Sequence, residues 1–142
     1  MLHPTDQQKI VDAIRIAERA TSGEVKVHVE PRCPGGDPYK RAVALFQRLG
    51  LTKTKDRNAV LIYVATRDRK FTIIGDQGIH EEVGSAFWAE AVQRMKVAFA
   101  RGAFGEGISG AIQSVGQRLA KKFPRKIDDV NEIDNEITTD ET

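Results

Sequence analysis

The sequence predicts an α/β domain in which helices flank a mixed central sheet. The chain has 142 residues, of which 40% are hydrophobic and 30% are charged, as expected for one domain with one core. Its apolar residues follow a helical period in some segments and a strand pattern in others, and these segments run in the order α-β-α-β-β-α-α. A helix joins the first two predicted strands, so they should be parallel through a right-handed crossover, and the third strand should pair antiparallel to the second.

The first predicted elements are a helix and a strand. Apolar residues recur at spacings of three and four from residue 5 to residue 20, which indicates a helix. Gly23 follows the break in that pattern and is suited to the end of a helix. In residues 24–30, valines alternate with polar residues, which predicts a half-buried strand whose other face reaches solvent or a helix edge. That polar face consists of Glu24, Lys26, His28 and Glu30.

A second helix and a β-hairpin follow. Residues 31–38 contain three prolines and two glycines and should form a loop. Residues 39–51 return to helical spacing, with Asp37 as the N-cap and a proline in the first turn. Residues 59–65 are almost continuously apolar, as in a central strand covered on both faces. A short polar turn then leads into residues 70–75, and the two runs should form a hairpin.

The second half of the body should be helical. A long helix with one broad apolar face follows residue 78, and helical spacing places Trp88 on its core stripe. The glycines in residues 102–107 predict a break. Apolar residues from Ile108 onward predict a last helix that stops at Phe123, before a proline.

The charge divides the chain into a basic body and an acidic tail. Residues 1–126 hold all 22 Lys and Arg but 13 of the 20 Asp and Glu, a net charge of +9, whereas residues 127–142 hold the other seven acids and no base, a net charge of −7. The predicted organisation is therefore an α/β domain over residues 1–126 and a tail over residues 127–142. A narrow apolar stripe on the tail leaves two alternatives, a disordered solvated segment or a short amphipathic helix that docks on the body. The stripe consists of Ile127, Val130, Ile133 and Ile137.

Several classes of protein are disfavoured by composition. No apolar run approaches the ~18 residues that a membrane span needs, and the charged N-terminal stretch does not fit a signal peptide. Cys33 is the only cysteine, which excludes an internal disulfide and a thiolate zinc cage and favours a cytoplasmic location. The basic residues form no stripe interleaved with aromatic residues, so a nucleic-acid partner is not favoured.

Three acidic residues should meet at one end of the sheet. Given the predicted strand directions, the starts of the first two strands lie beside the end of the third, which brings together Glu24, Asp56 and Asp76. Oxygen ligands without His or Cys suit calcium or magnesium. The alternative for each is structural: a turn at Asp56, a helix N-cap at Asp76, or an ion pair of Glu24 with a neighbouring base.

Other reactive side chains have plainer interpretations. His28 is interpreted as a solvent-facing residue on the polar face of its strand. His80 is close enough to the acidic rim to act as an acid or base, but an ordinary position at a helix start is the alternative. Cys33 is not accompanied by a nearby base in the sequence, so it is interpreted as a spectator thiol.

Residues 55–65, Arg67–Lys70 and Ile74–Ile79 form a distinctive combination, supported by Thr21–Glu24, Phe99–Gly102 and Gly107–Ile108. In this combination the sequence resembles the TPM domain family in its short bacterial form, over about residues 5–124. The resemblance implies an α/β sandwich with a mixed sheet and a divalent cation, most often calcium, at acidic loops on one end of the sheet. Asp56 and Asp76 match the acidic positions of the family motif, Glu24 matches a less regular one, and Ala59 stands where the family usually has glycine.

The resemblance leaves two functions to compare. The first is a non-enzymatic interaction module with calcium or magnesium at the rim and an unidentified protein partner. The second is a metal-assisted acid phosphatase, because some plant lumenal relatives resemble acid phosphatases, and Arg57 on the rim offers donors for a phosphate. Longer relatives carry a signal peptide and a membrane helix, which this sequence does not show, so the expected location remains cytoplasmic.

Overall fold

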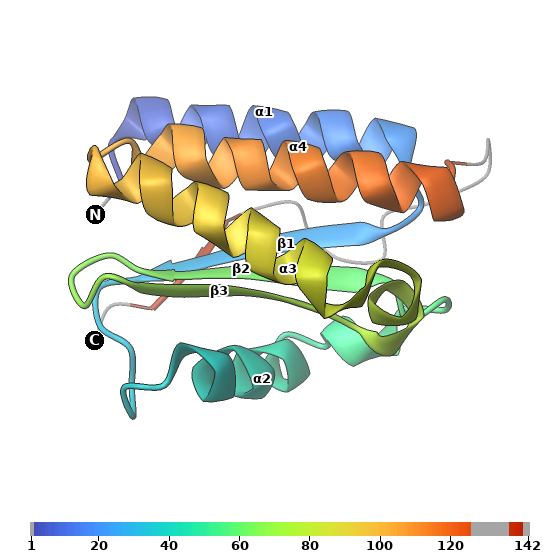
Figure 1. Cartoon of the computed structure of the whole chain (residues 1–142), viewed down its shortest axis with the longest axis horizontal. Helices are drawn as coiled ribbons and strands as arrows, with labels where there is room; N and C mark the ends of the chain where they lie inside the picture. The colour runs from blue at the N-terminus through green and yellow to red at the C-terminus, as the bar shows by residue number, and fades with distance from the viewer. Residues whose placement is uncertain (1, 126–136, 141–142) are drawn as a thin grey trace.

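The computed structural model describes residues 2–125 and 137–140 and forms three layers (Figure 1). Helices α1, α3 and α4 cover one face of a central sheet, and α2 covers the other. The predicted fold class and order of elements are confirmed. In chain order, the elements are α1 (Pro4–Ala20), β1 (Glu24–Glu30), α2 (Pro38–Arg48), the short 3-10 helix η1 (Leu51–Lys53), β2 (Ala59–Ala65), β3 (Lys70–Gly75), α3 (Gln77–Ala100), α4 (Phe104–Lys122) and β4 (Thr138–Thr139).

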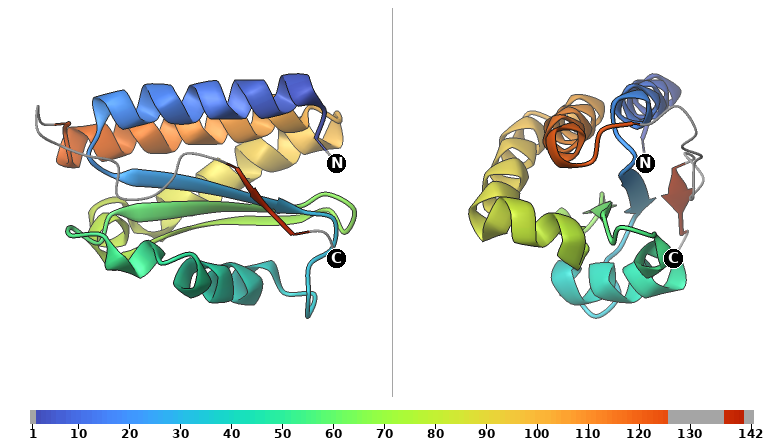
Figure 2. Two further views of the ribbon diagram at one scale, coloured as in Figure 1. Left: turned by 180° about the vertical axis from the view of Figure 1, so that it is seen from behind. Right: turned by 90° about the vertical axis from the view of Figure 1, so that its right-hand side faces the viewer.

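The sheet has the strand order β3-β2-β1-β4. β1 and β2 are parallel, with Glu24 opposite Ala59, and β2 and β3 form the predicted antiparallel hairpin. β4 is the addition that the sequence pattern did not predict: it pairs parallel to the free edge of β1, with His28 opposite Thr138 (Figure 2). This end of the acidic tail is therefore a strand, whereas the sequence analysis weighed a solvated segment against a helix. The other predicted tail residues, 127–136 and 141–142, lie outside the described residues.

Two hydrophobic clusters fill the spaces between the layers. The larger cluster lies between the sheet and helices α1, α3 and α4, and contains the predicted Trp88. The smaller cluster lies on the α2 side and includes Tyr63 and Cys33. All seven residues of β2 are buried, as predicted for a central strand, because its side chains alternate between the two clusters. In the described residues, no helix is long and apolar enough to cross a membrane.

The prediction that β1 is half-buried is wrong, because all seven of its residues are buried. The valines enter the larger cluster as expected. The polar face is buried as well, and His28, interpreted as solvent-facing, is only 1% exposed. The reason is tertiary: α2 lies over this face and β4 lies along the strand edge. Burial of charged groups is costly unless they are paired, so this face requires partners from other elements.

Helix α4 begins four residues earlier than predicted, within the glycine-rich segment that was expected to break the helix. Gly105 and Gly107 are buried in its first turns. A Cβ at Gly105 would lie 2.4 Å from a carboxylate oxygen of Asp6, and one at Gly107 would lie 2.7 Å from the ring of Phe99. These two glycines therefore allow close helix packing and do not end the helix.

Candidate functional sites at the two ends of strand β1

The acidic rim lies where β1 and β2 begin and β3 ends, as the predicted strand directions require. Glu24 is the first residue of β1 and is opposite Ala59. The backbone N–H of Asp76, just after β3, donates to the carbonyl of Ala59 over 2.9 Å. The turn that contains Asp56 leads into β2 and also contacts the start of α3, since Gly78 N–H donates to the carbonyl of Arg57 over 2.9 Å.

Asp76 has two structural roles at this rim. Its side chain caps α3 by accepting from the backbone N–H of Gln77 over 2.8 Å. It also accepts two hydrogen bonds from Arg57, at 2.5 Å from Nε and 2.8 Å from Nη2. Hydrogen bonding to Asp76 raises the pKa of Arg57 above its usual value. The N-cap alternative considered for Asp76 thus describes part of its role, and its ion pair with Arg57 is the other part.

The two other predicted ligands differ in exposure. Glu24 is buried at 8% exposure and Asp56 is exposed. Asn58 lies two residues after Asp56 and directly before β2, and the sequence analysis did not propose it as a ligand. It is 1% exposed, and its Oδ1 has no hydrogen-bond partner among the described residues. A buried acceptor without a donor is costly, and an oxygen of this kind is a suitable ligand for a hard cation.

The opposite end of β1 holds a second group of polar side chains, which the sequence analysis did not predict as a site. Within the described part of the chain, the three ligand-type residues with atoms within 4.8 Å of one another are His28, Glu30 and Asp140. Glu24, Asp56 and Asp76 do not form such a group there, so a cation held jointly by them stays a prediction. His28 and Glu30 come from the polar face of β1, and Asp140 follows β4.

Two arginines of α2 neutralise the carboxylates of this second group. Arg41 donates to Glu30 from Nε over 2.9 Å and from Nη2 over 2.8 Å, and its Nη2 also lies 2.9 Å from Asp140. Arg48 donates to Asp140 over 2.7 Å. Tyr63 of β2 donates its hydroxyl to Glu30. Arg41 and Arg48 are seven residues apart, which places both on one face of α2. This spacing could have been recognised from the sequence.

The charges of the group follow from these contacts. Burial raises the pKa of Glu30, but hydrogen bonds from Arg41 and Tyr63 outweigh it and leave the pKa below its usual value. Hydrogen bonding to Arg48 lowers the pKa of Asp140. Burial raises the pKa of Tyr63, with a further contribution from its hydrogen bond to Glu30. At neutral pH the group therefore contains two carboxylates, two guanidinium groups and a neutral phenol.

Burial favours the neutral form of His28 in this group. It lowers the pKa of His28, and this outweighs the raising effects of Glu30 and Asp140. His28 Nδ1 lies 2.9 Å from the hydroxyl of Thr138, which also lies 3.3 Å from the carbonyl oxygen of Val27. His28 Nε2 faces Glu30 at 3.6 Å and Asp140 at 3.5 Å and has no hydrogen-bond partner among the described residues.

The comparisons with known proteins agree with the resemblance found in the sequence. The TPM domain family model matches residues 1–118. The chain belongs to the TPM domain family. No curated protein matches it.

Two solved structures have the same fold. The BA42 protein of the psychrophilic bacterium Bizionia argentinensis is 40% identical, with a TM-score of 0.87 over 99% of this chain and 96% of that one. The N-terminal domain of the cg2496 protein of Corynebacterium glutamicum is 18% identical, with a TM-score of 0.61 over 82% of this chain and 73% of that one, which shows likeness of fold alone.

The remaining candidates from the sequence have structural partners in this TPM domain. His80 Nδ1 accepts from the indole N–H of Trp88 over 2.9 Å, across the kink that Gly84 introduces into α3 with its φ of 75°. Cys33 is buried in the smaller hydrophobic cluster. The structure thus places both in contact with packed side chains, and their plainer interpretations fit these positions.

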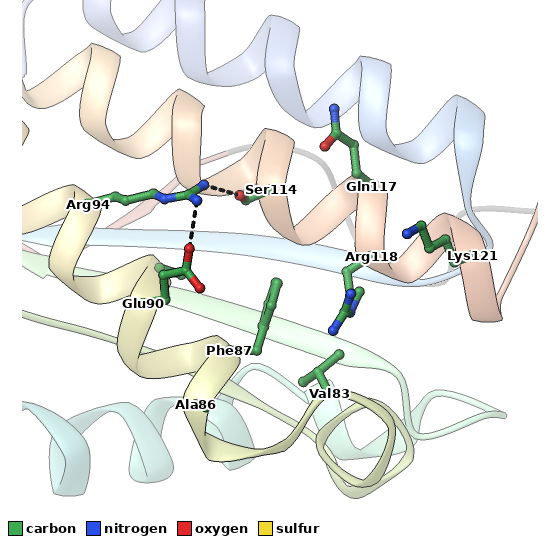
Figure 3. A pocket seen from close by; sticks show the side chains of 10 residues that line it. Val83, Ala86, Phe87, Glu90, Arg94, Ser114, Gln117, Arg118 and Lys121 are labelled. Atoms are coloured by element: carbon green, nitrogen blue, oxygen red, sulfur yellow. Dashed lines mark hydrogen bonds and ion pairs between the residues drawn. The ribbon is translucent and has the colours of Figure 1, made fainter.

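A groove of about 430 Å³ between α3 and α4 is also explained by packing (Figure 3). Arg94 on its wall donates to Glu90 over 2.7 Å and to Ser114 over 3.3 Å. The guanidinium of Arg118 lies over the ring of Phe87, 5.3 Å from its centroid. Both arginines thus link the two helices across the groove.

We expect the stability of the TPM domain to fall as the pH drops below about 6.5, through His28. The unfolded chain takes up a proton on His28 near the usual pKa of 6.5, whereas the folded chain does so at lower pH because burial lowers this pKa. The contribution of His28 to the free energy of unfolding is therefore complete above pH 6.5. It is lost as the pH falls from 6.5 to the lower pKa of His28 in the folded chain. Glu30 and Asp140 lose their contribution only at a more acidic pH, because their pKa values are lowered from 4.5 and 3.8.

Urea unfolding at several values between about pH 7.5 and pH 5 measures this effect. The matched control is His28→Gln, which removes this imidazole and leaves the other two histidines in place. The pH slope in this range should be smaller in the variant than in the parent. Identical slopes in the two proteins would show that the His28 pKa is not lowered by folding.

Proposed function

We propose that this TPM domain binds a divalent cation, calcium or magnesium, at the rim formed by Glu24, Asp56, Asn58 and Asp76. The observation that carries the proposal is the buried Oδ1 of Asn58, which has no hydrogen-bond partner among the described residues and belongs to the same turn as Asp56. Every side-chain group offered there is a hard oxygen ligand, which suits these two cations. The four residues come from three segments that hydrogen bonds hold at one end of the sheet.

Arg57 competes with a cation for Asp76 in this proposal. Because it donates to both carboxylate oxygens, a cation that uses Asp76 must share or displace these hydrogen bonds. Arg57 has 39% side-chain exposure and so has room to move toward solvent. The rim would then change shape when the cation binds. Such a change would suit a non-enzymatic interaction module, because it would couple cation binding to the surface that a partner contacts.

We expect millimolar calcium or magnesium to raise the Tm of the full chain relative to the chain in chelator. A site with a Kd of about 0.1 mM would stabilise the fold by about 2.7 kcal/mol at about 10 mM cation. Asp56→Asn should abolish the shift, because this exposed carboxylate is a ligand without a packing role. Arg57→Gln should tighten binding by about threefold to tenfold, because it frees Asp76 and removes a positive charge.

Glu90→Gln is the matched control, since Glu90 is an exposed carboxylate paired with Arg94 on the helical layer. It should keep the full cation effect. An absent shift in the parent chain, or an equal shift in Asp56→Asn, would refute the rim site. Hydrolysis of a chromogenic phosphate ester that disappears in Asp56→Asn would instead establish the phosphatase alternative. The cytoplasmic location and the identity of a protein partner stay predictions.

A further inference from the structure

The free edge of β1 is occupied by a very short segment of the chain. β4 has only two residues and is opposite His28 and Val29, while β1 has seven residues. A strand this short contributes few ladder hydrogen bonds, so its position must depend on its side chains. The side chains of residues 137–140 and their contacts therefore define what this edge recognises.

These contacts alternate between the two faces of the sheet. Ile137 packs against the larger hydrophobic cluster. The hydroxyl of Thr138 lies 2.9 Å from His28 Nδ1 and 3.3 Å from the carbonyl oxygen of Val27. Thr139 is exposed, and Asp140 lies against the two arginines of α2. The sheet edge thus holds an apolar residue, a hydroxyl and a carboxylate at positions one, two and four of an extended segment.

The charges at this edge favour an acidic occupant. Without Asp140, the described residues of this edge retain Arg41 and Arg48 against one carboxylate, Glu30, which Arg41 already neutralises. Arg48 would then have no carboxylate partner among the described residues. His28 Nδ1 would also lose its hydrogen-bond partner in a buried position, which is costly. A hydroxyl and a carboxylate on the incoming segment satisfy both groups.

We propose that the edge of β1, with His28, Arg41 and Arg48, is a recognition site for extended acidic segments, and that residues 137–140 are its resident ligand. The partner chemistry is an apolar residue, then Thr or Ser, any residue, and Asp or Glu, added to the sheet as a parallel strand. The covalent connection gives the resident segment a high effective concentration, so a partner binds by displacing it. This site lies at the opposite end of β1 from the cation rim and is independent of it.

The test uses the full chain with Asp140→Asn, which weakens the resident ligand, in the presence of chelator so that the cation rim takes no part. The probe is a fluorescent peptide with the sequence of residues 134–142, and binding is measured by anisotropy. The peptide should saturate this host and should bind the parent chain about tenfold more weakly, because the intact tail competes. Thermal unfolding of the host verifies that the variant is folded.

Two peptide variants provide a matched pair. Thr138→Val removes the hydroxyl that contacts His28, and should weaken binding by about fivefold. Thr139→Val makes the same chemical change on the exposed side chain and should change binding less than about twofold. A peptide with Asp140→Asn should bind at least about tenfold more weakly, because it loses charge-assisted hydrogen bonds.

A change in the host tests the other side of the contact. Adding Arg48→Gln to the Asp140→Asn host should weaken binding of the unmodified peptide. The loss of affinity should be about as large as the loss caused by Asp140→Asn in the peptide. Arg48 is half-exposed and its contact with Asp140 is at the surface, so this host should remain folded. Absence of saturation in the Asp140→Asn host at millimolar peptide, or equal affinity of the two valine peptides, would overturn the proposal.

Discussion

Replacing Arg41 with leucine is expected to lower the free energy of unfolding by about 3–5 kcal/mol. The side chain of Glu30 is fully buried, and Arg41 supplies it with two hydrogen bonds and the opposite charge. The substitution leaves a buried carboxylate with the Tyr63 hydroxyl as its remaining donor in the described structure. Urea unfolding of Arg41→Leu and the parent chain measures the loss.

The double variant Glu30→Gln/Arg41→Leu tests the cause of this effect. Without the buried charge, much of the lost stability should return, so the two changes should be strongly non-additive. Arg94→Leu is the surface control and should cost less than about 1 kcal/mol, because its pair with Glu90 is well exposed. A small loss in Arg41→Leu, or simple additivity in the double variant, would mean that Glu30 does not depend on Arg41.

Replacing Gly78 with alanine is expected to lower the free energy of unfolding by about 1–3 kcal/mol and to weaken the effect of added cation. A Cβ at this position would lie 2.3 Å from the carbonyl oxygen of Asp56 and 2.7 Å from that of Arg57. These are backbone atoms, so the turn must move away from the start of α3. This movement would separate Asp56 from Asp76 at the proposed cation rim.

Gly110→Ala is the control for the change from glycine to alanine itself. Gly110 lies in α4, and nothing lies within 4 Å of a Cβ built there. This variant should gain about 0.5–1 kcal/mol from helix propensity. Thermal and urea unfolding of both variants, with and without calcium, compares them directly. The same stability for the two variants would show that the turn is not held closely against α3.

Local patterns determined most of the elements and their order. The apolar run of residues 59–65, the polar turn after it and residues 70–75 predicted β2 and β3 with their observed bounds, since a hairpin depends on residues close in sequence. The N-cap at Asp37 was predicted for the same reason, and its side chain accepts from two backbone N–H groups of α2. The strand directions then placed the acidic rim at one end of the sheet, before any side-chain geometry was known.

Tertiary structure alone decided which polar groups meet. The sequence presented Glu30 and His28 as the outer face of a half-buried strand, whereas α2 and β4 bury them. The contact of Arg41 with Asp140 joins residues 99 positions apart, and no periodicity records such a pairing. Helical and strand periods report only which side of an element is apolar. The partner of a buried charge depends on which elements the fold packs against it, so His28, Glu30 and Asp140 became a site only in three dimensions.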